Sequence, residues 1–148
     1  MQTRVNIELL PIEDDGFHIL MEGKINGKTA RLLIDTGASR TVFDLERIRL
    51  FLPEDHPLEK IDKLSTGLGT NTMESQVVVL KKFRLGRITL ENYKAVALNM
   101  KHINQSYKML GYPLIDGVLG GDLLLQLNAV IDYKNMRIRL GTFEVKDQ

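Results

Sequence analysis

The chain has 148 residues and no cysteine, and its 20 basic and 19 acidic residues give a formal net charge of +1. A chain of this length can bury enough apolar surface to fold as one domain, residues 1–148, without disulfides or a structural metal. The missing cysteines exclude a disulfide framework, a zinc knuckle and a thiol nucleophile. The balanced charge gives no long-range field that would attract nucleic acid or an anionic membrane.

The first twelve residues alternate polar and apolar types and include Glu8, unlike the continuous apolar core of a secretion signal. No apolar run approaches the roughly 20 residues that a membrane-spanning helix requires. We therefore expect a cytoplasmic protein, or a periplasmic or secreted one if a leader has been removed.

Residues 17–34 predict a β-hairpin whose first strand alternates apolar and polar residues. The pair Asn26-Gly27 is a strong signal for a two-residue turn. The second strand, Ala30–Ile34, ends in three apolar residues, which is typical of a strand buried on both faces. Such a strand would carry Asp35 into the interior of the molecule.

Two segments follow before the strands resume. Thr41–Phe43 can continue extended, and Asp44 is a candidate N-cap for a short helix through Phe51 that ends before Pro53. Residues 54–64 are charged and contain a proline, which predicts a loop.

The second half of the chain is again rich in strand signals. We predict strands at Gln76–Leu80, Phe83–Leu85 and Ile88–Met100, with a turn at Gly86. Residues 101–114 show no clear period, which predicts irregular structure with room for one helical turn.

The end of the chain predicts a short helix and a closing hairpin. The helix is expected at Asp122–Leu127, and the hairpin joins Ala129–Asp132 to Arg137–Leu140 through a turn at Lys134-Asn135. The whole pattern indicates an all-β domain with one or two short helices.

The triplet Asp-Thr-Gly at residues 35–37 carries the chemistry. Alone it is a weak signal, because a chain this long contains it by chance about 3% of the time. Here it follows the end of an apolar strand, and an apolar-apolar-Gly sequence before a short helix echoes it later in the chain. The residues of these two elements are Asp35, Thr36, Gly37, Ala38 and Ser39, and Val118, Leu119 and Gly120.

Together these elements resemble the retropepsin-like branch of the aspartic peptidases, over roughly Phe17 to Leu140. The resemblance implies a closed β-barrel in which the apolar-apolar-Gly element packs across the Asp-Thr-Gly loop. It also implies a glycine-rich flap that closes over the substrate. The candidate flap residues are Gly67, Leu68 and Gly69, although this glycine spacing also occurs in ordinary exposed loops.

Peptide hydrolysis without a metal or a covalent intermediate needs a base that takes a proton from water and an acid that protonates the carbonyl oxygen. Two adjacent carboxylates can share one proton and divide these roles. The chain has one Asp-Thr-Gly, and the Asp-Gly pair Asp116-Gly117 precedes the apolar-apolar-Gly element instead of ending a buried strand. The second carboxylate is therefore expected from a second copy, in a two-fold homodimer that needs no cofactor and no metal.

The neighbours of Asp35 have expected roles. Gly37 permits a tight turn that brings its N–H to the carboxylate. Thr36 resembles the family residue whose hydroxyl bonds across the two-fold axis. Ala38 lacks the hydroxyl that pepsin-like enzymes often place there to favour the charged carboxylate, which predicts an activity optimum nearer neutral pH. Ser39 replaces the second Asp that is common in viral retropepsins.

Other polar residues have simpler interpretations. Asp35 itself could be a turn residue that bonds its own backbone. The same holds for Asp132 in its hairpin, and Asp44 and Asp122 fit helix caps. The histidines are too widely spaced for a zinc site, and the basic residues between Lys81 and Arg87 lack the aromatic platform of a nucleic-acid surface.

The sequence thus predicts a homodimeric aspartic endopeptidase that binds an extended peptide. One alternative is a catalytically weak retropepsin-like dimerisation or peptide-binding module. A bare scaffold, however, has no reason to keep two repelling carboxylates at its axis. A second alternative is one half of a heterodimer, which the mass of the purified protein would distinguish.

Overall fold

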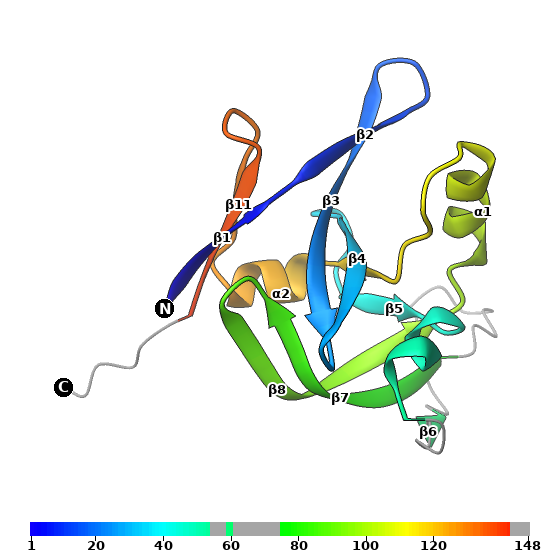
Figure 1. Ribbon diagram of the computed structural model, residues 1–148, viewed down its shortest axis with the longest axis vertical. Coiled ribbons are helices and arrows are strands. Elements are labelled where there is room, and N and C mark those ends of the chain that lie inside the picture. Colours follow the sequence, from blue (N-terminus) through cyan, green and yellow to red (C-terminus); the bar gives the residue numbers. More distant parts are fainter. Residues whose placement is uncertain (54–58, 61–74, 143–148) are drawn as a thin grey trace.

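The computed structural model of the chain describes residues 1–53, 59–60 and 75–142. Its strands build a closed six-stranded β-barrel (Figure 1). The barrel closes because β3 pairs with β4 on one side and with β7 on the other. Around the barrel the order is β3 (Gly16–Ile25), β4 (Lys28–Ile34), β9 (Gly117–Leu119), β5 (Val42–Asp44), β8 (Ile88–Leu98) and β7 (Ser75–Leu85).

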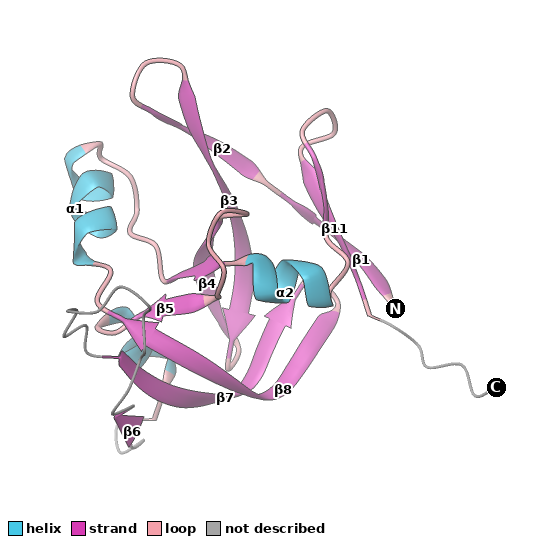
Figure 2. Cartoon of the chain, turned by 180° about the vertical axis from the view of Figure 1, so that it is seen from behind, coloured by secondary structure: helices cyan, strands magenta, loops and turns pink. Residues whose placement is uncertain are grey.

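Further strands extend the barrel and form a second sheet. β2 (Glu8–Ile12) pairs with β3, and β6 (Glu59–Lys60) pairs with β7. A separate three-stranded sheet has the order β1 (Gln2–Asn6), β11 (Arg137–Gly141) and β10 (Val130–Asp132). The predicted C-terminal hairpin is therefore confirmed, and the N-terminal strand joins it (Figure 2).

The first hairpin forms for local reasons, as predicted. Asn26 and Gly27 both have positive φ values, 50° and 84°, which a two-residue turn matching the twist of the strands requires. The Asn26 side chain donates to the Phe51 carbonyl at 3.0 Å and accepts from the Lys82 N–H at 3.1 Å. The turn is thereby also tied to two other elements.

β9 is inserted between β4 and β5. These two strands flank residues 35–41, which we call the Asp35 loop. β9 runs parallel to β4, where Val118 lies opposite Leu33, and antiparallel to β5, where Val118 lies opposite Val42. This arrangement places the apolar-apolar-Gly element directly across the loop.

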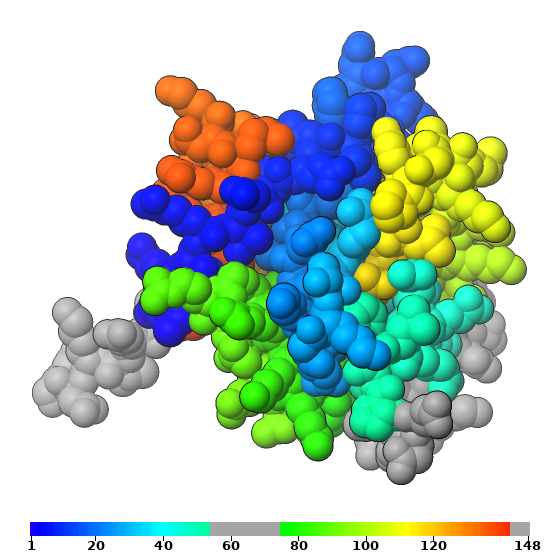
Figure 3. All heavy atoms as spheres, viewed as in Figure 1, coloured from blue at the N-terminus to red at the C-terminus, as the bar shows by residue number. Residues whose placement is uncertain are grey.

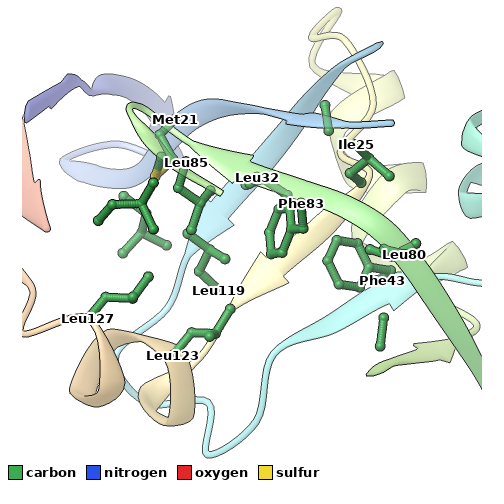
Figure 4. Close-up of a cluster of buried hydrophobic side chains, with 14 of the residues drawn as sticks. Met21, Ile25, Leu32, Phe43, Leu80, Phe83, Leu85, Leu119, Leu123 and Leu127 are labelled. Atoms are coloured by element: carbon green, nitrogen blue, oxygen red, sulfur yellow. The ribbon is translucent and has the colours of Figure 1, made fainter. Parts of the chain in front are cut away.

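The barrel interior is filled by branched and aromatic side chains (Figure 4). Phe43 and Phe83 meet edge to face with ring centroids 5.4 Å apart, a geometry that aromatic quadrupoles favour. α2 (Gly121–Gln126) contributes Leu123 and Leu124 to the same core, as does β11 through Leu140. The short helix predicted here is confirmed.

A second apolar cluster lies on the outer face of β3 and β4. Leu20 and Leu33 from these strands pack with Val118 and with Tyr107 of α1 (Lys101–Met109). In Figure 3 the yellow segment that follows α1 lies against the blue N-terminal strands, where the Tyr112 hydroxyl donates to the Pro11 carbonyl at 2.8 Å.

α1 corrects the prediction of irregular structure for residues 101–114, because it is a nine-residue helix. Its period was hidden because one of its two buried residues is polar. The Asn104 amide donates to the Ile115 carbonyl at 3.1 Å and accepts from the Ile115 N–H at 2.8 Å. No helix in the described ranges is long and apolar enough to cross a membrane.

Two further boundaries differ from prediction. β7 is one continuous strand, because the exposed Lys82 pairs opposite Glu91 rather than interrupting the ladder. The helix after Asp44 is a 3-10 helix, η1 (Arg47–Phe51), and Asp44 itself ends β5. The Asp44 carboxylate still accepts the Arg47 N–H at 3.0 Å, so it caps the turn from the preceding strand.

Candidate active site

The Asp35 loop begins where β4 ends. The Asp35 N–H donates to the Leu119 carbonyl of β9 at 3.0 Å, which fixes the start of the loop. The Gly37 N–H donates to Asp35 Oδ1 at 2.9 Å, and the Ala38 N–H donates to the Asp35 carbonyl at 3.1 Å. A Cβ atom on residue 37 would lie 3.3 Å from that same carboxylate oxygen. The loop therefore wraps closely around the carboxylate.

The carboxylate faces outward, which corrects the expectation that β4 carries it into the interior. Leu33 and Ile34 are buried, whereas Asp35, Thr36 and Gly37 are exposed. Burial ends at Ile34 because the barrel ends there. In one copy of the chain the loop thus presents its polar residues to the surface.

Gly120 makes the closest contact with the second half of the loop. A Cβ atom at this position would lie 2.5 Å from the Arg40 carbonyl carbon and 2.9 Å from the Ala38 carbonyl oxygen. Real Cβ atoms do not approach backbone this closely, so a glycine is required. The neighbouring Gly121 N–H donates to the Ala38 carbonyl at 2.6 Å.

Thr41 and Asp122 complete the attachment of the loop. The sequence did not predict a contact between these two residues. The Thr41 N–H and hydroxyl both donate to Asp122 Oδ1, at 2.8 and 2.7 Å. The Thr41 hydroxyl also accepts the Gly120 N–H at 3.0 Å. Asp122 also accepts the Leu123 N–H at 2.8 Å, but its predicted role as a helix cap is wrong, because Gly120 is the N-cap of α2 and no side chain caps the helix. No spacing rule links residues so far apart in the sequence, and the burial of Thr41 becomes apparent only in the folded structure.

Asp116 and Asp132 are engaged away from the loop. Asp116 is only 3% exposed, and its two oxygens accept from Arg47 Nε at 2.7 Å and from the Arg31 N–H at 2.8 Å. Asp132 accepts two hydrogen bonds from Asn135, and these bonds lower the pKa of its carboxyl. Neither is available as a second carboxylate for Asp35.

Apolar side chains border the loop on the side of the second cluster. Ala38 and Val42 pack against this cluster, together with Ile103 of α1. Tyr107 is buried there, and burial raises its pKa to about 12. Its hydroxyl lies 2.8 Å from His18 Nδ1, which gives this histidine a structural contact.

Of the remaining predicted site residues, the structure describes three and leaves the candidate flap outside its described ranges. Val118 and Leu119 are buried in β9, and Ser39 is exposed on the loop. The candidate flap, Gly67, Leu68 and Gly69, lies outside the described residues. Within the described ranges no group of three His, Asp or Glu side chains could hold a metal ion.

Comparisons with known proteins identify the family and the fold. A model of the family described as "Aspartyl protease" matches residues 21–123, which is more than half of the chain. The comparison with curated proteins found no match.

Two solved structures share the fold at low sequence identity. A retropepsin-like aspartic protease from Rickettsia conorii is 15% identical, with a TM-score of 0.52 over 95% of this chain and 90% of that one. The retroviral protease-like domain of Ddi1 from Leishmania major is 13% identical, with a TM-score of 0.53 over 87% of this chain and 96% of that one. The chain therefore belongs to the aspartyl protease family and has a retropepsin-like fold.

Proposed function

We propose that the chain is an aspartic endopeptidase whose catalytic dyad consists of Asp35 from each of two copies. The observation that carries this proposal is the exposed Asp35 carboxylate, held by the Gly37 N–H at 2.9 Å in the family's motif. An exposed carboxylate in a rigid loop can meet its own symmetry mate across a two-fold axis.

The chemistry follows from placing two carboxylates in contact. Like charges disfavour double ionisation, so the pair holds one proton between them. The ionised Asp35 takes a proton from water while the water oxygen attacks the peptide carbonyl carbon. The protonated Asp35 of the other copy gives its proton to the carbonyl oxygen. Collapse of the tetrahedral intermediate, with a proton passing to the amide nitrogen, then breaks the C–N bond.

The substrate is an extended peptide. Such a peptide places alternate side chains on opposite sides of its backbone, and the apolar border made by Ala38 and Val42 offers a contact on one side. Thr36 is assigned to a bond with the partner loop, since it is exposed next to Asp35. Gly67, Leu68 and Gly69 are assigned to the flap on the family order alone.

Cleavage of a mixed peptide library, from acid to mildly alkaline pH, tests the proposal. The parent protein and Asp35→Asn are compared after each is shown to have dimer mass, with Asp132→Asn as a control carboxylate outside the loop. We expect cleavage by the parent and the control and none by Asp35→Asn. A confirmed dimer of the parent that cleaves nothing would instead support a peptide-binding or dimerisation module.

A further inference from the structure

The two halves of the Asp35 loop are attached to the barrel in different ways. The first half, residues 35–37, is joined to β9 by one backbone bond from Asp35. The second half is residues 38–41. The second half meets the junction of β9 and α2 through the bond from Gly121 to Ala38 and through three bonds centred on Thr41. The position of the loop is therefore determined mainly by this junction.

Asp122 is the charged side chain at the centre of this attachment. Its Oδ1 atom accepts three hydrogen bonds, two from Thr41 and one from Leu123, all between 2.7 and 2.8 Å. Bonds to an ionised acceptor are shorter and about twice as strong as neutral ones. Thr41 is only 2% exposed, so water cannot easily replace its bonds to Asp122.

The Thr41 hydroxyl passes this restraint on to the rest of the loop. It donates to Asp122 and accepts from the Gly120 N–H, which fixes its rotamer. Gly120 in turn lies in contact with the backbone of Ala38 and Arg40. A shift of Asp122 or Thr41 would therefore move the backbone that follows Asp35.

We propose that Asp122 is a positioning residue, which holds the Asp35 loop through Thr41 so that the two Asp35 carboxylates meet in register. This proposal rests on the function proposed above. Two-fold symmetry makes the requirement strict, because a displacement of the loop in one copy is repeated in the other. Misplacement of reacting groups by about 1 Å can reduce a rate by about a hundredfold.

Tyr93 of β8 is a third neighbour of this contact. Burial and, to a smaller extent, the negative charge of Asp122 raise the pKa of Tyr93 to about 12, and a hydrogen bond with Thr41 opposes this shift. Tyr93 is therefore an uncharged neighbour at neutral pH. It thus adds no second negative charge beside the Asp122 carboxylate.

Kinetics of Asp122 variants give the first test. Asp122→Ala removes the acceptor, whereas the amide oxygen of Asp122→Asn can still accept the Thr41 bonds. We expect Asp122→Ala dimers to lose kcat by about a hundredfold with KM nearly unchanged, and Asp122→Asn to recover most of kcat. Asp132→Ala is the matched control, because it removes an aspartate that caps a turn outside the loop.

Amide hydrogen exchange gives a second readout that does not depend on cleavage. The N–H groups of Gly37 and Ala38 both bond Asp35, so their protection reports how well the loop is held. We expect faster exchange at both amides in Asp122→Ala, near-parent exchange in Asp122→Asn, and no change in Asp132→Ala. Asp122→Asn also covers the case in which Asp122→Ala does not fold.

The two experiments distinguish a failure of the positioning role of Asp122 from a failure of the proposed peptidase function. If the parent cleaves peptides but Asp122→Ala keeps its kcat and its protected amides, Asp122 is not a positioning residue. The same conclusion follows if Asp122→Asn folds and keeps both Thr41 bonds but still differs from the parent in kcat and in amide exchange. If the parent dimer cleaves nothing, the exchange measurement still decides whether Asp122 holds the loop.

Discussion

At the scale of single residues, Asp35 and Asp122 differ in what their oxygens bind. Asp122 Oδ1 accepts three hydrogen bonds, whereas Asp35 Oδ1 accepts one, from Gly37. Asp35 is exposed, and no described residue bonds its Oδ2 atom. The Asp122 oxygen is therefore occupied by the contact that holds the loop. Asp35 keeps an exposed oxygen that a water or a second carboxylate can reach.

Gly120→Ala should destabilise the protein. Its Cβ atom would lie 2.5 to 2.9 Å from backbone atoms of Arg40 and Ala38, and such overpacking costs about 2–3 kcal/mol. Gly121→Ala is a matched control, because its nearest such contact is at an ordinary 3.5 Å. Thermal unfolding should show a clear loss for the first variant and almost none for the second. Equal melting temperatures would contradict the close packing described here.

Ala38→Ser should move the onset of activity to lower pH. A hydroxyl beside the dyad can donate to a carboxylate and stabilise its charged form. The ionised base is then present in more acid solution, so the acid limb of the pH–rate profile moves downward. The parent optimum should lie nearer neutral pH. A parent profile that peaks at strongly acid pH would contradict the reason given for Ala38.

Single residues differ in how far their roles can be predicted from the sequence. The sequence predicts Asp35 as the catalytic carboxylate from a local signal, three residues at the end of an apolar strand. Thr41 was missed because its partners Gly120 and Asp122 come from a distant segment. Such a contact becomes visible only when β9 is placed between β4 and β5.

At the scale of elements, turn chemistry and apolar alternation predicted two hairpins and one helix correctly. The hairpin at Asn26-Gly27, the closing hairpin and α2 all follow from local patterns. α1 did not, because its buried Asn104 and Tyr107 are tied by polar contacts as well as by apolar packing. β1 was not predicted as a partner of β11, because pairing between the two ends of a chain leaves no local signal.

The burial of Tyr93 and Tyr107 predicts a stability change at alkaline pH. Their pKa values of about 12 in the folded protein lie above the value of ~10 for tyrosine in an unfolded chain. Their contribution to stability is therefore complete below pH ~10 and is lost as the pH rises towards 12.

Phenolate absorbance and denaturant unfolding measure this change. We expect Tyr93 and Tyr107 to titrate late in the parent, and Tyr107→Phe to lose one of these two late-titrating groups. Unfolding curves of the parent should show falling stability between pH ~10 and ~12. If Tyr107→Phe kept two late-titrating groups, the buried position of Tyr107 on α1 would be wrong.

At the scale of the whole molecule, activity should depend on protein concentration. Each copy supplies one Asp35, so a monomer lacks the second carboxylate. We expect specific activity to fall on dilution from micromolar to nanomolar concentration, in step with the loss of dimer mass. An active species with monomer mass at every concentration would contradict the shared dyad.

The insertion of β9 between β4 and β5 has a consequence for biosynthesis. The two strands that flank the Asp35 loop, β4 and β5, leave the ribosome well before β9, the strand that pairs with both. Pairing across such sequence distances makes folding slow. We therefore expect the loop to become ordered late, after translation has passed residue 119. If the proposed peptidase function holds, a nascent chain without a formed Asp35 loop could not yet cleave its neighbours on the same polysome.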